Sequence, residues 1–142
     1  MTDFNLDEFL PYQLAELSRR VSARFSQAYR ERYGISVAEW RVVAHLSQQT
    51  AVSVREIHKR VGMDKPKVSR AATRLEAAGY LRKVVNPVDR RLVELSLTPK
   101  GREMIDTLAP IAADYQAELF AVLGDEAGEF VDRVKVLSAA LE

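Results

Sequence analysis

The stretch from Lys65 to Arg74 is rich in side chains that donate hydrogen bonds, and it contains no acid. Its polar members are Lys65, Lys67, Ser69, Arg70, Thr73 and Arg74. Arginines can fork onto the acceptor edge of guanine, hydroxyls bond to bases or phosphates, and lysines pair with phosphates. The chemistry that these residue types indicate is recognition of a nucleic acid groove.

A second cationic group, Asp89-Arg90-Arg91, follows at a turn that begins at Asn86. A carboxylate beside two guanidinium groups can fix one of them, and an arginine held in this way suits a narrow minor groove, where the negative potential is strongest. Alone, such a tripeptide is usually only a polar turn. Its position after the first group makes Arg90 and Arg91 candidate DNA contacts and Asp89 the residue that orients them.

Charge is unevenly distributed along the chain, although the net charge at pH 7 is only +1. Residues 55–91 hold eleven bases and four acids, whereas residues 103–142 hold nine acids and two bases. A basic middle favours a polyanion partner at one surface. Charge alone is equally consistent with a solvated helical face.

Catalytic and metal chemistry lack the residues that they need. The chain has no cysteine, so thiolate nucleophiles, thiol redox sensing and cysteine-ligated zinc are excluded. His45 and His58 have no neighbouring ligands, and no glycine-rich phosphate loop occurs. We therefore predict no enzyme activity, no cofactor and no metal. We also expect a cytoplasmic protein, because no apolar run approaches the roughly 20 residues of a membrane span and the start of the chain lacks a signal-peptide pattern.

Several helices must position these groups. One apolar stripe predicts a long helix over residues 8–33, which ends at Gly34. Ser36 and Glu39 have the spacing of a capping box and open a helix to about Gln48. The same spacing, Ser53 to Glu56, opens a short helix that ends at Gly62. Asp64 caps a fourth helix, with Pro66 in its first turn, and Gly79 ends it.

Two strands and two further helices complete the pattern. Leu81 to Val85 and Leu92 to Leu97 are predicted as a two-stranded hairpin. Thr98-Pro99 then starts a long helix, with a kink expected at Pro110 and an end at Gly124. A last helix runs from Asp125 to the end of the chain. The whole is predicted as one domain, 1–142, mainly α with a small β-hairpin wing.

The order of helix, helix, turn, helix and hairpin over residues 36–98 is that of a winged helix-turn-helix. At 100° per residue, the fourth helix places four apolar residues on one side: Val68, Ala71, Ala72 and Leu75. The opposite side carries Pro66, Arg70, Thr73, Arg74 and Ala77, with Lys67 and Ser69 beside them. This side is the predicted reading surface for a major groove.

The chain resembles the MarR family of regulators in three segments: Leu75-Glu-Ala-Ala-Gly79-Tyr-Leu81, Asp89-Arg-Arg91 and Leu95-Ser-Leu-Thr98-Pro-Lys-Gly101. The resemblance implies a homodimer formed by the terminal helices, here 8–33 and 99–141, that binds pseudo-palindromic double-stranded operators and is released by small ligands, often aromatic acids or phenols. It also implies that Arg91 reaches the minor groove, a role that Arg90 could share or replace. The apolar stripes support the dimer independently, because one small core cannot cover them all.

Effector binding is the least determined part of the interpretation. Tyr12, Arg20, Trp40, Arg41 and His45 are candidate contacts for an aromatic or phenolic carboxylate. Tyr12 and Trp40 also suit a hydrophobic core, which is the commoner use of such residues, and His45 is more often an ordinary helix histidine than a ligand contact. Besides a DNA-binding repressor, a winged-helix protein-interaction module stays open, although it predicts an apolar patch near Arg70. Whether binding represses or activates is also open.

Overall fold

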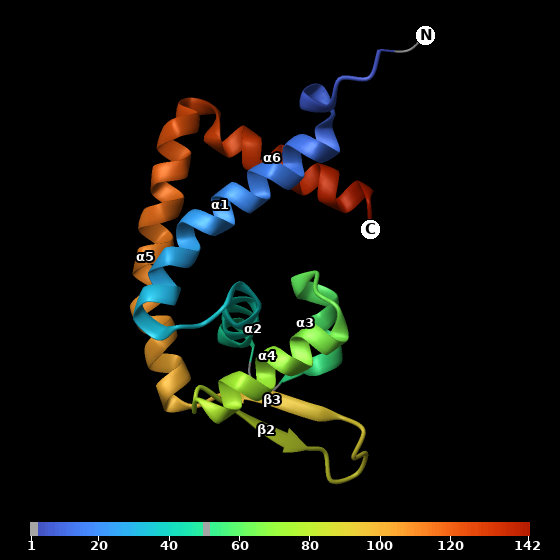
Figure 1. Ribbon diagram of the computed structural model, residues 1–142, viewed down its shortest axis with the longest axis vertical. Helices are drawn as coiled ribbons and strands as arrows, with labels where there is room; N and C mark the ends of the chain where they lie inside the picture. The colour runs from blue at the N-terminus through green and yellow to red at the C-terminus, as the bar shows by residue number, and fades with distance from the viewer. Residues whose placement is uncertain (1–2, 50–51) are drawn as a thin grey trace. The chain divides into compact units, whose positions relative to one another are not determined.

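The computed structural model describes residues 3–49 and 52–142, and it resolves into two compact units, one up to Leu108 and one of Ala109–Glu142 (Figure 1). The α-helices are α1 (Leu10–Tyr33), α2 (Val37–Gln48), α3 (Val54–Val61), α4 (Lys65–Ala77), α5 (Pro99–Leu123) and α6 (Ala127–Ala140). The strands are β1 (Val52–Ser53), β2 (Leu81–Val85) and β3 (Val93–Leu97), and short 3-10 helices η1 and η2 cover Leu6–Glu8 and Gly124–Glu126. The mainly helical winged fold is confirmed, and the single domain stays a prediction.

Among the described residues, no helix combines the length and the apolar character that a membrane crossing requires.

The helix starts follow the caps that the sequence predicts. At α2, the Glu39 amide donates to the Ser36 hydroxyl (3.2 Å) and the Ser36 amide donates to the Glu39 carboxylate (2.9 Å), which completes the capping box. At α3 only half of the predicted box forms. The Glu56 amide donates to Ser53 Oγ (3.1 Å), but the Glu56 carboxylate accepts from that same hydroxyl (3.3 Å) and not from the Ser53 amide. Ser53 also belongs to a strand, so its backbone already takes part in a sheet.

The predicted hairpin of β2 and β3 is present, and β1, which the sequence pattern did not predict, adds a third strand to the sheet. The strand order is β1-β3-β2, all antiparallel, with Leu81 opposite Leu97 and Val52 opposite Leu95. A strand of two residues has no alternation by which a sequence pattern could reveal it. The buried pair Val52 and Leu95, exposed by only 1% and 0%, accounts for the pairing.

Two helix boundaries also differ from the prediction. The first α-helix begins at Leu10, after the 3-10 turn η1, and not at residue 8. The last begins at Ala127, because residues 124–126 form the 3-10 turn η2. Pro110 lies inside α5, which runs as one helix to Leu123. Gly34, Gly62 and Gly124 have φ near 65° at the predicted ends, where a left-handed backbone favours glycine.

The core of the first unit gathers apolar side chains from α2, α3, α4, the sheet and the first half of α5. Its most deeply buried members include Val42, Val43, Leu46, Val52, Ile57, Val68, Ala71, Ala72, Leu75, Leu81, Leu95, Met104 and Leu108. All four residues predicted on the inner side of the helix after Asp64 are among them. Figure 1 shows α4 beside the hairpin of β2 and β3. One face of α4 is thus held by the core while the other remains exposed.

A close backbone contact joins the turn between α4 and β2 to the start of α5. The Thr98 hydroxyl donates to the Gly79 carbonyl (2.6 Å), and the Gly101 amide donates to that hydroxyl (3.2 Å). A Cβ atom at Gly101 would overlap the carbonyl oxygen of Tyr80. The glycine of the Thr98-Pro-Lys-Gly101 segment is therefore required for close approach and not for an unusual φ.

Candidate nucleic-acid interface

A capping hydrogen bond forms at the start of α4. Asp64 accepts a hydrogen bond from the Lys67 amide (2.8 Å), and Pro66 lies in the first turn, where no helical hydrogen bond is lost. Lys65, Pro66 and Lys67 are all exposed. The helix start therefore presents two ammonium groups to solvent.

The outer face of α4 carries Ser69, Arg70, Thr73 and Arg74, which together line a shallow hollow. Arg70, Thr73 and Arg74 are exposed and Ser69 is half-buried. The acid of this helix, Glu76, accepts a hydrogen bond from the Lys83 amide (3.2 Å), and its carboxylate lies 4.0 Å from Lys83 Nζ. Its charge is thus compensated within the protein, and the hollow is lined by arginine and hydroxyl side chains.

The two arginines of this face differ in their partners. Arg74 Nη1 lies 3.3 Å from Glu39 Oε1, and the Glu39 side chain is only 8% exposed. Glu39 is the capping-box acid of α2, so the same carboxylate caps the start of α2 and pairs with an arginine of α4. In the described part of the chain, the Arg70 side chain has no hydrogen bond or ion pair. Arg70 is accordingly the arginine that is free to reach an outside acceptor.

Lys83 is a residue of this face that the sequence pattern did not suggest. It lies on β2, and its ammonium donates to the Thr73 hydroxyl (2.9 Å), which in turn donates to the Ser69 carbonyl (2.9 Å). Alternation along a strand shows which side a residue faces, but it does not show which helix lies against it. No local signal could have paired Lys83 with Thr73.

In the hairpin turn, Asp89 holds Arg91. The Arg91 guanidinium donates from Nε (3.1 Å) and Nη2 (3.3 Å) to the carboxylate, and the Arg91 amide donates as well (3.1 Å). The side-chain hydrogen bond is the largest cause that lowers the pKa of Asp89, followed by the backbone hydrogen bond, with a smaller effect of the Arg55 charge. The Arg91 side chain is 90% exposed, so it is oriented without being covered. Arg90 is exposed beside it.

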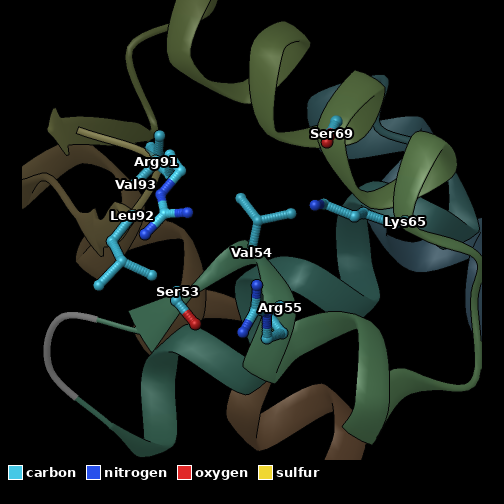
Figure 2. Close-up of a pocket in the computed structure, with 8 residues that line it drawn as sticks. All are labelled: Ser53, Val54, Arg55, Lys65, Ser69, Arg91, Leu92 and Val93. Atoms are coloured by element: carbon cyan, nitrogen blue, oxygen red, sulfur yellow. The ribbon is translucent and has the colours of Figure 1, made fainter. Parts of the chain in front are cut away.

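A second hollow lies between the wing and the helices (Figure 2). Residues of β1, α3, α4 and the wing line it: Ser53, Val54, Arg55, Lys65, Ser69, Arg91, Leu92 and Val93. Figure 2 shows the cationic groups of Arg55, Lys65 and Arg91 around Val54. Arg55 was not among the predicted contacts, because its place in the second residue of a short helix carries no distinctive signal. Three cations from three elements suit a phosphate group.

The five candidate effector residues are not gathered in one hollow. Trp40 stacks on Tyr29 (5.5 Å between centroids, 18° between planes) and meets the edge of Phe25 (5.2 Å), which is a core arrangement. Arg41 lines a hollow between α1 and α2 together with Arg19 and Arg30. That hollow is also lined by Ser18, Ser22, Ala23, Ser26 and Val37.

The other three candidates have separate surroundings. Tyr12 is 38% exposed on α1, and Arg20 lies 3.7 Å from Glu16. Among the described residues, Nε2 of His45 is buried without a hydrogen-bond partner. Burial is the main cause that lowers the pKa of His45, and the charge of Arg60 adds to it. The effector role of all five stays a prediction.

Within residues 3–49 and 52–142, no three His, Asp or Glu side chains are grouped so that they would hold a metal ion.

Comparisons with known proteins give the family. A model described as MarR family matches residues 33–92. The HTH-type transcriptional regulator PapX of Escherichia coli is 30% identical over 127 residues, which cover 84% of this chain and 77% of that protein. The chain belongs to the MarR family. The predicted family and the predicted DNA-binding regulator are thereby confirmed, and these relatives are transcriptional regulators rather than enzymes.

Solved structures agree with this assignment. A MarR family transcriptional regulator from Silicibacter pomeroyi DSS-3 superimposes with a TM-score of 0.86 at 27% identity, over 99% of this chain and 100% of that one. BpsR of Bordetella bronchiseptica, whose DNA binding is regulated by 6-hydroxynicotinic acid, superimposes with a TM-score of 0.83 at 26% identity, over 99% of both chains. The fold over the whole chain is that of MarR family regulators.

Proposed function

We propose that this MarR family regulator binds a pseudo-palindromic operator as a homodimer, with α4 in the major groove and the wing in the minor groove. The observation that carries the proposal is the exposed face of α4, which is cationic and whose acid, Glu76, is paired with Lys83. The proposed DNA contacts are Lys65, Pro66, Lys67, Ser69, Arg70, Thr73, Arg74, Arg90 and Arg91. A regulator of this kind acts where the genome lies, which in a bacterial or archaeal cell is the cytoplasm.

The contacts divide into those that read bases and those that position the protein. Arg70, which has no partner among the described residues, is the proposed guanine reader. Arg74, anchored by Glu39, is the proposed backbone contact beside it. Lys65 and Arg55 hold a phosphate in the hollow next to the wing, and Arg91, oriented by Asp89, enters the minor groove.

The homodimer is supported by apolar side chains that are exposed in each unit. On α1 and the segment before it these are Phe9, Leu10, Leu14 and Leu17, and on α5 and α6 they are Phe120, Leu123, Phe130, Val134 and Leu137. Large apolar groups at helical spacing call for a partner surface. A twofold dimer presents two copies of α4, which is why the operator is expected to be pseudo-palindromic.

A small aromatic or phenolic carboxylate is the proposed effector, and it releases a repressor from DNA. Its proposed site is the hollow between α1 and α2, where Arg30 and Arg41 offer guanidinium groups to a carboxylate, while Arg19, which also lines the hollow, is paired with Glu16 at 3.0 Å. The likeness to BpsR supports an effector of this chemical class. Titration of candidate acids against the protein–DNA complex tests this part separately.

The central experiment selects bound duplexes from a random pool and compares two variants. Arg70→Ala is expected to relax base preference at about one position per half-site at a cost of about 1–3 kcal/mol, whereas Arg91→Ala weakens all duplexes more evenly. Arg24→Ala, which removes an exposed arginine from α1, is the control and should leave binding unchanged. Equal behaviour of the Arg70 and Arg91 variants would contradict the roles. A chain that ignores every duplex at low salt would favour the protein-interaction module.

A further inference from the structure

Thr73 lies on the reading face of α4, but its hydroxyl is already used within the protein. The hydroxyl donates its only proton to the Ser69 carbonyl, one turn earlier (2.9 Å). It also accepts a hydrogen bond from Lys83 Nζ (2.9 Å). A hydroxyl has one proton and two lone pairs, so no donor and only one acceptor site is left for an outside group.

Further interactions hold Lys83 in the position from which its ammonium donates to the Thr73 hydroxyl. Its side chain is only 27% exposed, and its ammonium lies 4.0 Å from Glu76 Oε1. Its backbone amide donates to the same carboxylate (3.2 Å). Because two further interactions restrain Lys83, the Thr73 hydroxyl stays covered on that side. The remaining non-hydrogen group on the Thr73 Cβ is the methyl.

The surroundings of Thr73 are consistent with an apolar contact. Thr73 is exposed, and the shallow hollow that it lines with Ser69, Arg70 and Arg74 presents mostly carbon atoms. In the major groove, the apolar group that a base presents is the 5-methyl of thymine, and threonine methyls contact it. 5-Methylcytosine presents the same group at the same place.

We propose that Thr73 reads the 5-methyl group of a pyrimidine through its own methyl, and that Lys83 enforces this reading by occupying the hydroxyl. The inference rests on the proposed placement of α4 in the major groove. Arg70 precedes Thr73 by three residues, about 4.5 Å along the helix axis, and neighbouring base pairs are about 3.4 Å apart. The methylated pyrimidine therefore lies within one or two base pairs of the guanine that Arg70 reads.

The test begins with the duplex that the protein selects, in which each thymine is replaced in turn by uracil. This change removes only the methyl. One position per half-site is expected to lose about fourfold in affinity, as burial of one methyl group predicts, while the other positions change little. At that position, 5-methylcytosine should bind about fourfold better than cytosine. Equal affinities in both comparisons would overturn the inference.

Two variants distinguish the methyl from the hydroxyl. Thr73→Val keeps the methyl and should retain both affinity and uracil sensitivity, whereas Thr73→Ser keeps the hydroxyl and should lose the sensitivity. Lys83→Met, which opens a second acceptor site on the hydroxyl while its proton stays on the Ser69 carbonyl, should broaden the base preference at this position. The opposite pattern, with Thr73→Ser unaffected and Thr73→Val blind to the base, would show reading by the hydroxyl. Circular dichroism verifies that each variant is folded.

Failure of this inference and failure of the proposed function give different results. If no duplex is selected at all, the placement of α4 on DNA is wrong. If duplexes are selected and Arg70→Ala relaxes their sequence, but no thymine is sensitive to uracil, only the role of Thr73 is wrong.

Discussion

Helices α4 and α6 have similar apolar periodicity, but the apolar side is buried in α4 and exposed in α6. In α4 the apolar residues Val68, Ala71, Ala72 and Leu75 are all within 1% of full burial, and the polar side faces outward. In α6 the apolar residues Phe130, Val134 and Leu137 are 39–44% exposed. Periodicity therefore shows that a helix has two sides, but it does not show what covers the apolar one. A helix with its polar side outward presents a complete recognition surface, whereas one with its apolar side outward needs a partner.

The regions that contain α4 and α6 also differ in charge. Residues 55–91 have an excess of bases, whereas residues 103–142 have nine acids and two bases. An acidic region repels a DNA backbone, so it suits protein contacts rather than nucleic acid contacts. These differences fit the proposals that the first region recognises DNA and that the second mediates self-association.

The largest expected effect comes from breaking the apolar side of α6. Phe130→Asp places a charge in the proposed interface, so the protein should become monomeric, which light scattering measures. Affinity for a two-half-site operator should fall by about 100-fold or more, because the two reading helices are no longer linked. Ala139→Asp, on the opposite side of α6 at 100° per residue, is the matched control. A dimeric Phe130→Asp protein with unchanged binding would refute the assignment.

A smaller effect is expected from the reading side of α4. Lys67→Ala removes one exposed ammonium near the helix start, so it should weaken all duplexes similarly and reduce the slope of log affinity against log salt by about one. Fluorescence anisotropy at several salt concentrations measures the slope. A variant that changes base preference but leaves the slope intact would mean that Lys67 contacts a base.

Releasing Arg74 sharpens the distinction between the two arginines of α4. Glu39→Gln retains an acceptor for the Ser36 amide but removes the charge that holds Arg74. Because the Arg74 side chain is 60% exposed, the pair is worth at most about 1 kcal/mol, and affinity should change by less than about fivefold. If Arg74 contacts the DNA backbone while Glu39 anchors it, as proposed, the slope of log affinity against log salt should not change. A slope that is steeper by about one would show that Glu39 keeps Arg74 away from the backbone in the wild type.

The smallest expected effect concerns His45, in the scaffold below the reading helix. Burial lowers its pKa below the ordinary 6.5, so the unfolded chain takes up a proton more readily than the folded one. The folded state therefore keeps its full stability above pH 6.5. It loses stability as the pH falls below 6.5, because the unfolded chain then binds the proton first. His45→Asn should therefore lose less of its unfolding free energy than the wild type between about pH 7.5 and pH 5.5. Urea titrations at both pH values measure this, and parallel losses would contradict it.

The sequence by itself determined the features that act over a few residues. Caps at Ser36 and Asp64 and the ends at Gly34 and Gly62 fall where their spacing predicts, because each depends on hydrogen bonds or φ angles within one turn. The inner side of α4 followed from the helical period alone. The Asp89–Arg91 pair, two residues apart, was also predictable as a fixed guanidinium beside a carboxylate.

Only the tertiary structure decided which elements meet. Glu39 and Arg74 are 35 residues apart, and Thr73 and Lys83 are ten apart on a helix and a strand. Strand β1 exists only because β3 lies beside it, and Arg55 joins Lys65 and Arg91 only because three elements converge. Such contacts depend on how the core packs, so no spacing along the chain encodes them. They also determine which polar groups on the reading face remain free to contact DNA.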